Sequence, residues 1–306
     1  MNDGGPSRTA LIAALMRAAH TRLDRPQLID DPWGDRLVSD AEKAALYQRV
    51  LDDADPERKG RLESLRSPQA AIDAVLRSHR TYAGVILRSR YAEDALEGAV
   101  AAGARQYVLI GAGFDSFIVR QPPFAREISI FEIDHPASQA MKRQRLEDCA
   151  VRIPPNVHFV PADLTRESLA SVLARSNFSR AGPAFFSWLG VTIYLPRDAN
   201  LATLRGVATS AAAGSEVVFT YIDQRALEER RSAALEKMRP SRATLREPWI
   251  SGFNPATLAK ELKALGLLLV EDLGGLELRD RYCAGQRNGL SPGTSGHVAR
   301  ARVAAS

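Results

Sequence analysis

The sequence has few cysteines and no long apolar run. Its 306 residues include only Cys149 and Cys283, which lie far apart, so a disulfide-rich scaffold is excluded. No apolar stretch approaches the ~20 residues that a membrane-spanning helix needs. Residues 1–6 are polar, unlike the apolar centre of a signal peptide. We therefore expect a cytoplasmic protein with no membrane partner.

The chain also has little excess charge of either sign. It holds 41 Lys and Arg against 36 Asp and Glu, a formal net charge of +5 with neutral histidine. This excess is modest and spread out, so it does not indicate a nucleic-acid partner, although it suits an anionic small molecule. A hydrophobic content of 45% excludes a disordered chain. The length fits one large domain or two small ones.

The first hundred residues show helical spacing and no convincing strand. Helical patterns cover residues 7–20, 40–51 and 68–100, the last with a break near Gly84. Ser67 followed by Pro68 is typical of an N-cap and a first helical position. The charged stretch 52–60 predicts a loop. Residues 1–102 are therefore predicted to be a helical region.

Strands alternate with helices after residue 103. The predicted strands are the apolar runs 106–110, 127–133, 157–160, 184–188, 216–221, 267–270 and 276–282. Helical patterns fall between them, the last one capped by Asn254 and starting at Pro255. This alternation predicts a mainly parallel sheet covered on both faces. The last two strands are too close for a helical crossover, so Gly274 and Gly275 between them predict an antiparallel hairpin.

The predicted fold class is thus α/β, a Rossmann-like seven-stranded sheet with a terminal antiparallel hairpin and an N-terminal helical lid. We assign the sheet and its helices to residues 103–284. The segment 285–306 is rich in Gly, Ser, Ala and Arg, so it is predicted to be a loose tail.

A glycine-rich turn follows the first predicted strand directly. Gly111, Ala112 and Gly113 let the backbone turn tightly and approach a ligand closely. The second strand ends at Asp134, whose carboxylate can accept hydrogen bonds from both hydroxyls of a ribose. The third ends near Asp163, which can receive an adenine amino group. Ligands of open parallel sheets bind beyond the carboxyl ends of the strands, so the three sites together indicate an adenosine ligand.

Each of these residues has an alternative interpretation. A glycine turn after a strand is often only a tight turn, and both Asp134 and Asp163 could cap the helices that follow them. A dinucleotide is a possible ligand class, but its fingerprint has a third glycine where this chain has Ser116. S-adenosyl-L-methionine has no phosphate, and its amino-acid end needs close backbone approach and a partner for its carboxylate.

Several short motifs follow one another in order along nearly the whole chain. They are Ser7 to Ala10 (SRTA), Asp31 to Trp33 (DPW), Arg88 to Asp94 (RSRYAED), Gly111 to Ser116 (GAGFDS), Phe131 to Pro136 (FEIDHP), Asp163 with Leu164, and Gly190 to Leu195 (GVTIYL). In this combination the chain resembles the class I S-adenosyl-L-methionine-dependent methyltransferases of the leucine carboxyl methyltransferase family, with its bacterial and polyketide O-methyltransferase relatives.

The resemblance implies a role for each matching residue. Arg88 corresponds to the arginine that pairs with the cofactor carboxylate, a task that suits a planar guanidinium, and Arg90 is the fallback. Asp134 corresponds to the ribose-binding acid, with Glu132 structural or secondary. The implied cofactor-binding residues are Arg88, Gly111, Ala112, Gly113, Asp134, Asp163, Leu164 and Leu189.

One position departs from the family pattern. The family usually has a glutamate directly before the glycine of the fourth-strand motif, and this chain has Leu189. An acidic partner for the cofactor ammonium is therefore missing or supplied elsewhere. Backbone carbonyls near Gly111 or Trp188 are candidates to replace it.

Methyl transfer requires the acceptor to be held in near-attack geometry with water excluded. A carboxylate acceptor is ionised at neutral pH and needs no general base, whereas a phenol, with a pKa of about 10, would benefit from one. His135 and His158 are the nearest strand-end histidines, and His135 is interpreted as structural. Tyr194 is predicted to position the acceptor or to pack in the core. No metal-binding cluster is predicted.

The predicted function is transfer of a methyl group from S-adenosyl-L-methionine to a carboxylate or phenolic hydroxyl of a small secondary metabolite. Methylation of a protein C-terminal carboxylate is the alternative, and an NAD(P)-dependent oxidoreductase or a non-catalytic binding protein is a more distant one.

We expect the N-terminal helices to cap the site and segment 225–249 to form another wall. The arginines of that segment are interpreted as a solvated face, with one or two available to an acidic substrate: Arg230, Arg231, Arg239, Arg242 and Arg246. The oligomeric state stays open.

Overall fold

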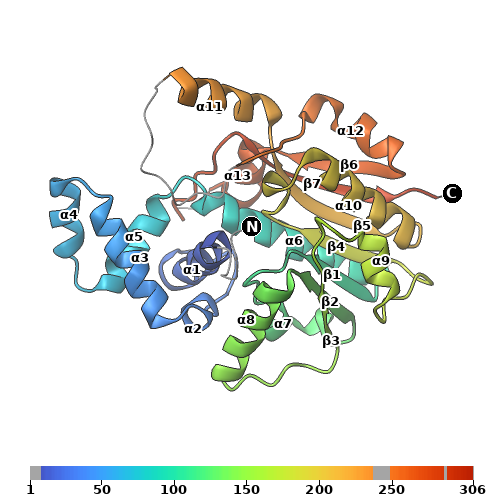
Figure 1. Ribbon diagram of the computed structural model, residues 1–306, viewed down its shortest axis with the longest axis horizontal. Coiled ribbons are helices and arrows are strands. Elements are labelled where there is room, and N and C mark those ends of the chain that lie inside the picture. The colour runs from blue at the N-terminus through green and yellow to red at the C-terminus, as the bar shows by residue number, and fades with distance from the viewer. Residues whose placement is uncertain (1–7, 237–248, 286–287, 306) are drawn as a thin grey trace.

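The chain begins with a group of helices that precede the sheet (Figure 1). The computed structural model describes residues 8–236, 249–285 and 288–305. The helices before the sheet are α1 (Arg8–Leu23), α2 (Gly34–Leu37), α3 (Asp40–Asp52), α4 (Pro56–Glu63), α5 (Pro68–Ser78) and α6 (Tyr82–Ala101). The helical character predicted for this region is confirmed.

Side-chain caps fix the starts of two helices as predicted. The Ser67 hydroxyl accepts a hydrogen bond from the Ala70 amide at 3.1 Å, and Pro68 is the first residue of α5. Asn254 caps α12 (Pro255–Ala264), accepting from the Ala256 amide at 3.0 Å. Both caps satisfy amides that have no partner within their own helix.

Two local predictions in the helical region are wrong. The stretch 52–60 is not a loop throughout, because Asp55 accepts a hydrogen bond from the Arg58 amide at 2.8 Å and starts α4. The break in the long helix falls between α5 and α6 at residues 79–81, and Gly84 lies inside α6. A charged stretch can be helical when a capping side chain stands at its start.

A seven-stranded sheet organises the rest of the chain. The strands are β1 (Gln106–Ile110), β2 (Ser129–Asp134), β3 (Val157–Pro161), β4 (Ala184–Trp188), β5 (Glu216–Ile222), β6 (Leu267–Leu273) and β7 (Gly296–Val303). Their order across the sheet is β3-β2-β1-β4-β5-β7-β6. Strands β1 to β5 pair in parallel, and β7 pairs antiparallel with both β5 and β6. The predicted mainly parallel sheet with antiparallel terminal strands is confirmed.

Helices connect these strands. They are α7 (Phe117–Arg120), η1 (Pro123–Ala125), α8 (Pro136–Asp148), α9 (Leu169–Ala174), η2 (Thr192–Tyr194), α10 (Arg197–Ser210), α11 (Gln224–Glu236), α12 and α13 (Gly275–Cys283). Alternate residues of each strand face opposite sides of the sheet. Tyr107 and Leu109 pack with residues of α1 and α6, whereas Val108 and Ile110 pack with residues of α9, α10 and α12. The sheet is therefore covered on both faces.

The last strand of the sheet was predicted at the wrong place in the chain. Residues 276–282, predicted as a strand, belong to α13, so the tight hairpin at Gly274 and Gly275 does not exist. The last strand is β7, inside the segment 285–306 that was predicted to be a loose tail. The prediction failed because β7 alternates small apolar residues with arginines, and Arg302 is paired with Glu216 of β5 at 2.7 Å.

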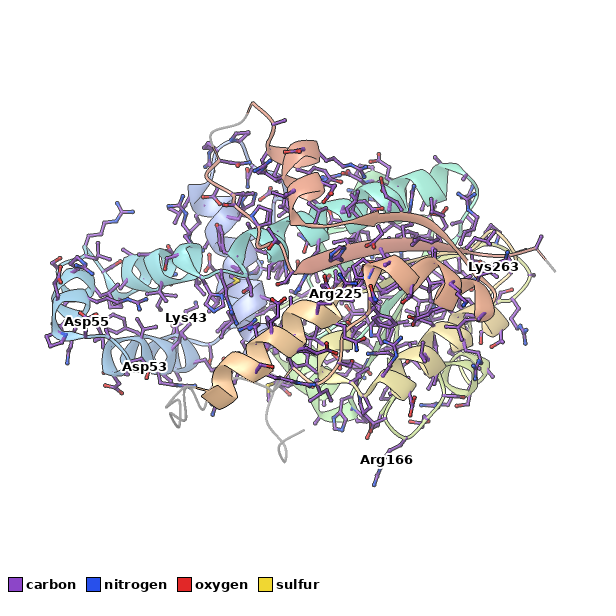
Figure 2. All side chains as sticks on the ribbon, turned by 90° about the horizontal axis from the view of Figure 1, so that it is seen from above. Lys43, Asp53, Asp55, Arg166, Arg225 and Lys263 are labelled. Carbon is purple, nitrogen blue, oxygen red and sulfur yellow. The ribbon has the colours of Figure 1, made fainter. Side chains whose placement is uncertain are left out.

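The charges of the protein are dispersed over its surface. Figure 2 shows Lys43, Arg166, Arg225 and Lys263 on separate parts of the molecule. In the described ranges, no helix combines the length and the apolar character needed to cross a bilayer.

Substitution of Ala301 by aspartate tests the structural role of β7. Ala301 is fully buried between the β5 and β6 partners of its strand. An unpaired carboxylate there should lower the free energy of unfolding by about 3 kcal/mol or more, measured by urea denaturation. Ala305→Asp, at an exposed position just beyond the strand, should change it by less than about 0.5 kcal/mol. Equal stability of the two variants would contradict the assignment of β7.

Candidate functional site

The glycine-rich turn lies at the carboxyl end of β1 and touches the loop after β4. Gly111 and Gly113 have φ values of +67° and +50°, in the left-handed region that favours glycine. A Cβ atom on Gly111 would lie 2.6 Å from Cγ2 of Val191. The Gly111 amide donates to the Ile133 carbonyl at 2.8 Å, which ties the turn to β2. The turn therefore needs glycine both for its dihedral angles and for its close contact.

Asp134 holds this turn from the end of β2. Its carboxylate accepts hydrogen bonds from the Gly113 amide at 2.5 Å and from the His135 amide at 2.7 Å. Burial raises the pKa of Asp134 above its usual value, although these two amides act in the opposite direction. His135 itself caps α8, accepting from the Ala137 amide at 3.3 Å. Asp134 and the glycine turn thus form one unit.

Glu132 belongs to the interior of the sheet, two residues before Asp134. Its carboxylate forms an ion pair with Lys142 at 2.5 Å, and both side chains are 1% exposed. Burial raises the pKa of Glu132 to about 7, although Lys142 acts in the opposite direction. The Glu132 carboxylate is therefore occupied inside the protein, beneath α8.

Asp163 follows β3 and is partly exposed. One of its oxygens, Oδ1, accepts hydrogen bonds from the Thr165 amide at 3.0 Å and from the Thr165 hydroxyl at 2.6 Å. These bonds hold the pKa of Asp163 below its usual value. Leu164 packs on the apolar cluster that contains β1 and β4 residues. Asp163 thus stabilises a local turn, and its second oxygen has no hydrogen bond within the described ranges.

Arg88 reaches the same edge of the sheet from α6. A Cβ atom on Gly190 would lie 2.6 Å from Nη2 of Arg88, so the guanidinium covers Gly190 in the loop after β4. Burial lowers the pKa of Arg88 to about 10, while Tyr194 and Asp115 act in the opposite direction. No described carboxylate lies within ion-pair distance of it. Among the residues that the structure describes, the partly buried Arg88 therefore has no counter-ion at hydrogen-bond range.

Arg90, the alternative to Arg88 as the arginine that binds the cofactor carboxylate, is paired with another residue. It forms an ion pair with Asp94 one turn further along α6, and this pair raises the pKa of Arg90 against the opposing effect of burial.

Leu189, at the position that departs from the family pattern, packs against the apolar cluster on the α6 side of the sheet. Tyr194 ends η2 and is partly buried.

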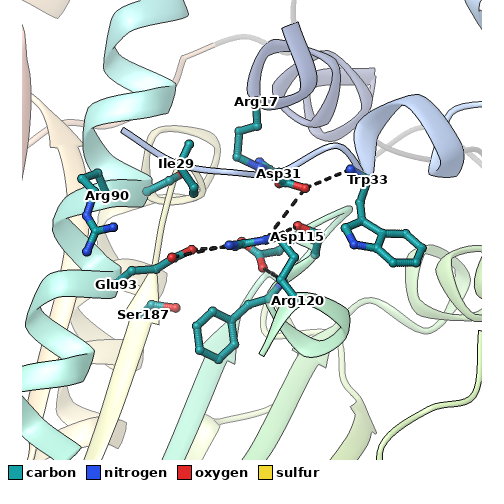
Figure 3. A network of polar contacts seen from close by, with 12 residues as sticks. Arg17, Ile29, Asp31, Trp33, Arg90, Glu93, Asp115, Arg120 and Ser187 are labelled. Atoms are coloured by element: carbon teal, nitrogen blue, oxygen red, sulfur yellow. Dashed lines mark hydrogen bonds and ion pairs between the residues drawn. The ribbon is translucent and has the colours of Figure 1, made fainter. Parts of the chain in front are cut away.

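A buried ion-pair network that was not predicted joins the N-terminal helices to the glycine turn (Figure 3). Arg17 of α1 donates from Nε to Oδ2 of Asp31 at 2.6 Å and from Nη2 to the Phe114 carbonyl at 2.8 Å. Arg120 lies 3.8 Å from Asp31 and donates to Glu93 of α6 at 2.5 Å. The network thus reaches α1, α6, α7 and the turn itself.

The pKa values of the charged groups in this network are set by their partners within it. Asp31 has no exposed side-chain surface. Its burial acts to raise its pKa, but Arg17 and Arg120 outweigh this effect, so the pKa lies below its usual value. The pKa of Arg120 is raised, chiefly by Glu93 and Asp31, against the opposing effect of burial. The DPW motif was a signal for Asp31, but nothing in the sequence distinguished Arg17 or Arg120 from solvated arginines.

Segment 225–249 is described only in part. Arg230 stacks over the Trp249 ring at 4.3 Å, and Arg231 donates to the Trp249 and Ile250 carbonyls at 3.2 Å and 3.0 Å. These two arginines therefore contact the end of the segment, whereas the prediction placed them mainly on a solvated face. Three further arginines of the segment lie outside the described residues: Arg239, Arg242 and Arg246. Within the described ranges, no group of histidine, cysteine or acidic side chains could hold a metal ion.

Comparison with known proteins gives one family. The model of the family described as leucine carboxyl methyltransferase matches residues 10–208. The Bacillus subtilis protein YktD, named as a candidate S-adenosyl-L-methionine-dependent methyltransferase, is 30% identical over 95% of this chain and 96% of its own. A Mycobacterium tuberculosis protein with the same kind of name is 30% identical over 76% of this chain and 71% of its own.

Solved structures share the fold. A candidate methyltransferase from Thermobifida fusca has a TM-score of 0.56 at 14% identity, covering 99% of this chain and 97% of that one. A Streptomyces avermitilis protein of the DUF574 family has a TM-score of 0.54 at 17% identity, covering 85% and 96%.

Substitution of Arg17 by methionine tests the network. It leaves Asp31 buried without its closest cation, so the free energy of unfolding should fall by about 3 to 5 kcal/mol in urea denaturation. Arg8→Met, at an exposed position on the same helix, serves as the matched control and should cost less than about 0.5 kcal/mol. A loss as small for Arg17→Met as for the control would show that the network contributes nothing to stability.

Proposed function

Because the chain belongs to the leucine carboxyl methyltransferase family, we propose that it transfers the methyl group of S-adenosyl-L-methionine to an oxygen of a small molecule, with a carboxylate as the preferred acceptor. Membership of the family makes it an S-adenosyl-L-methionine-dependent methyltransferase. The nature of the acceptor and the role of each residue are the substance of the proposal.

The residues at the carboxyl edge of the sheet fit this cofactor. Gly111 and Gly113 have no side chain to shield their backbone, and a Cβ atom on either would meet Val191 or Ala10 of this chain at 3.0 Å or less. Arg88 is a desolvated cation without a described ion-pair partner, as a binding site for a carboxylate requires. Asp134 stands at the end of the neighbouring strand β2. When bound, the cofactor supplies an electrophilic methyl group.

Each of these residues takes one part of the cofactor in the proposal. Arg88 binds the carboxylate of the methionine end, and the Gly111, Ala112 and Gly113 backbone lies against that end. Asp134 accepts hydrogen bonds from the ribose hydroxyls. Asp163 and Leu164 contact the adenine, through the second carboxylate oxygen and an apolar surface. Leu189 lies beside the methionine end but brings no charge.

The helical region before the sheet acts as a lid in this proposal. Arg17 links α1 to the Phe114 carbonyl of the glycine turn, and Arg120 links the turn to α6 through Glu93. A lid anchored in this way excludes water from the acceptor and fixes its orientation, which is the main requirement of an in-line displacement. Tyr194, which acts to raise the pKa of Arg88, is proposed to position the acceptor.

The positions of the histidines are the reason why we favour a carboxylate as the methyl acceptor. All five histidines lie in the described ranges. His20 is buried between Asp24 and the Leu28 amide, and His135 caps α8. His158 stacks on Phe131 on β3, and His297 lies on β7, which β5 separates from β4.

The remaining histidine, His79, contacts Thr81 between α5 and α6. None of the other four histidines forms a hydrogen bond, ion pair or ring contact with residues 189–196, the loop after β4, in the described part of the chain. A general base for a phenol would be expected at that loop. A carboxylate needs no such base, because it is already ionised at neutral pH. A phenolic hydroxyl and a protein C-terminal carboxylate remain the alternative acceptors of the same chemistry.

Substitution of Asp134 by alanine tests the ribose site. Loss of the acceptor for the ribose hydroxyls should weaken binding of S-adenosylhomocysteine at least about 30-fold in isothermal titration calorimetry, with the circular dichroism spectrum unchanged. Glu147→Ala, at an exposed position near the end of α8, should bind like the wild type. Unchanged affinity in Asp134→Ala would show that the ribose binds elsewhere.

The chemistry of the product tests the acceptor. Small carboxylic acids and phenols are incubated with cofactor labelled in its methyl group, and products are identified by mass spectrometry. A carboxylate acceptor gives a methyl ester, so mild alkali should release the label as methanol. Label that resists alkali would identify a phenol ether and refute the preference for carboxylates. Label found on a polypeptide C-terminus, with none on small acids, would favour the protein alternative.

A further inference from the structure

The charged groups around the glycine turn do not pair completely with one another. Arg17 is paired with Asp31 at 2.6 Å, and Arg120 with Glu93 at 2.5 Å. Among the residues that the structure describes, Arg88 and the carboxylates of Asp115 and Asp134 have no ion pair within 4 Å. Asp134 holds the Gly113 and His135 amides and is the proposed ribose acceptor, so Asp115 is the carboxylate of the turn that has no role assigned so far.

Asp115 lies at the end of the glycine turn, beside Arg120 (Figure 3). Its Oδ1 accepts a hydrogen bond from the Phe117 amide at 2.7 Å, which fixes the side chain at the start of α7. The Arg120 donors are directed instead to Ser116 at 2.9 Å and to Glu93. The residue is partly exposed, and its second oxygen has no hydrogen bond within the described ranges.

Arg88 covers Gly190, and the next residue, Val191, lies 2.6 Å from the Cβ position of Gly111 in the turn that Asp115 ends, so Arg88 and Asp115 belong to the same edge of the sheet. Asp115 also acts to raise the pKa of Arg88. Two opposite charges that are close but not in contact match a zwitterion placed between them, with each of its charges facing its opposite. The α-ammonium and α-carboxylate of an amino acid form such a zwitterion. The apolar side chain of Leu189 offers no competing charge at the loop after β4.

We propose that Asp115 is the binding residue for the α-ammonium group of the cofactor, opposite Arg88, which binds the α-carboxylate. This inference rests on the cofactor site proposed above. It assigns the ammonium to a carboxylate in the glycine turn and explains how the chain tolerates leucine at position 189. Recognition of the ammonium group is thereby moved from the loop after β4 to the loop after β1.

The substitution Asp115→Asn isolates the charge. Asparagine keeps the side-chain oxygen that accepts from the Phe117 amide, so α7 should start normally. Calorimetry compares S-adenosylhomocysteine with its analogue lacking the amino group, for the wild type and the variant. We expect Asp115→Asn to weaken binding of S-adenosylhomocysteine about 10- to 100-fold and to leave the affinity for the desamino analogue unchanged within about twofold.

Two further variants complete the design. Arg88→Met should weaken both ligands, since both carry the carboxylate. Adding Leu189→Glu to Asp115→Asn places a carboxylate at the family position and should recover at least about tenfold in affinity for S-adenosylhomocysteine only.

The outcomes distinguish the role of Asp115 from the cofactor site as a whole. Equal affinity of wild type and Asp115→Asn for S-adenosylhomocysteine, or equal weakening of both ligands, would overturn the role of Asp115 and leave the cofactor site in place. Absence of any binding of S-adenosylhomocysteine to the wild type would overturn the proposed function and this inference with it.

Discussion

The buried ion pair between Arg17 and Asp31 is the constraint on which the arrangement of the site depends. A charge removed from water is tolerated only with its partners in place, so such a network forms completely or costs several kcal/mol. Here the partners come from α1, the DPW motif, α6 and α7. Because Arg17 also donates to the Phe114 carbonyl, the helical region cannot shift without disturbing the glycine turn.

Much of the sheet was predictable because its signals are local. Strands β1 and β4 are continuous buried apolar runs, and both were placed with their observed bounds. Strand β7 was missed because its stability comes from pairing with β5 and from the contact of Arg302 with Glu216, 86 residues away. The alternation of apolar and charged residues in α13 resembled a strand, and only its packing decides otherwise.

Some residues of the site could also be predicted from the sequence, and others could not. The glycine turn and the residues near the ends of β2 and β3 could be inferred, since parallel strands bring their carboxyl ends to one edge. Arg88 was assigned by resemblance, and its lack of a described ion-pair partner fits that role. Arg17 and Arg120 could not be recognised, because the burial that gives an arginine its importance is a property of the assembled fold.

The order of the strands has a consequence for synthesis on the ribosome. Strand β7 lies between β5 and β6, although both precede it in the chain. Until residues 296–303 have left the exit tunnel, the apolar strand β5 presents an open edge, and β6 has no sheet to join. Nascent chains with unpaired edges are prone to pair with one another. Slow translation of the segment before β7 would lengthen the exposure of this edge.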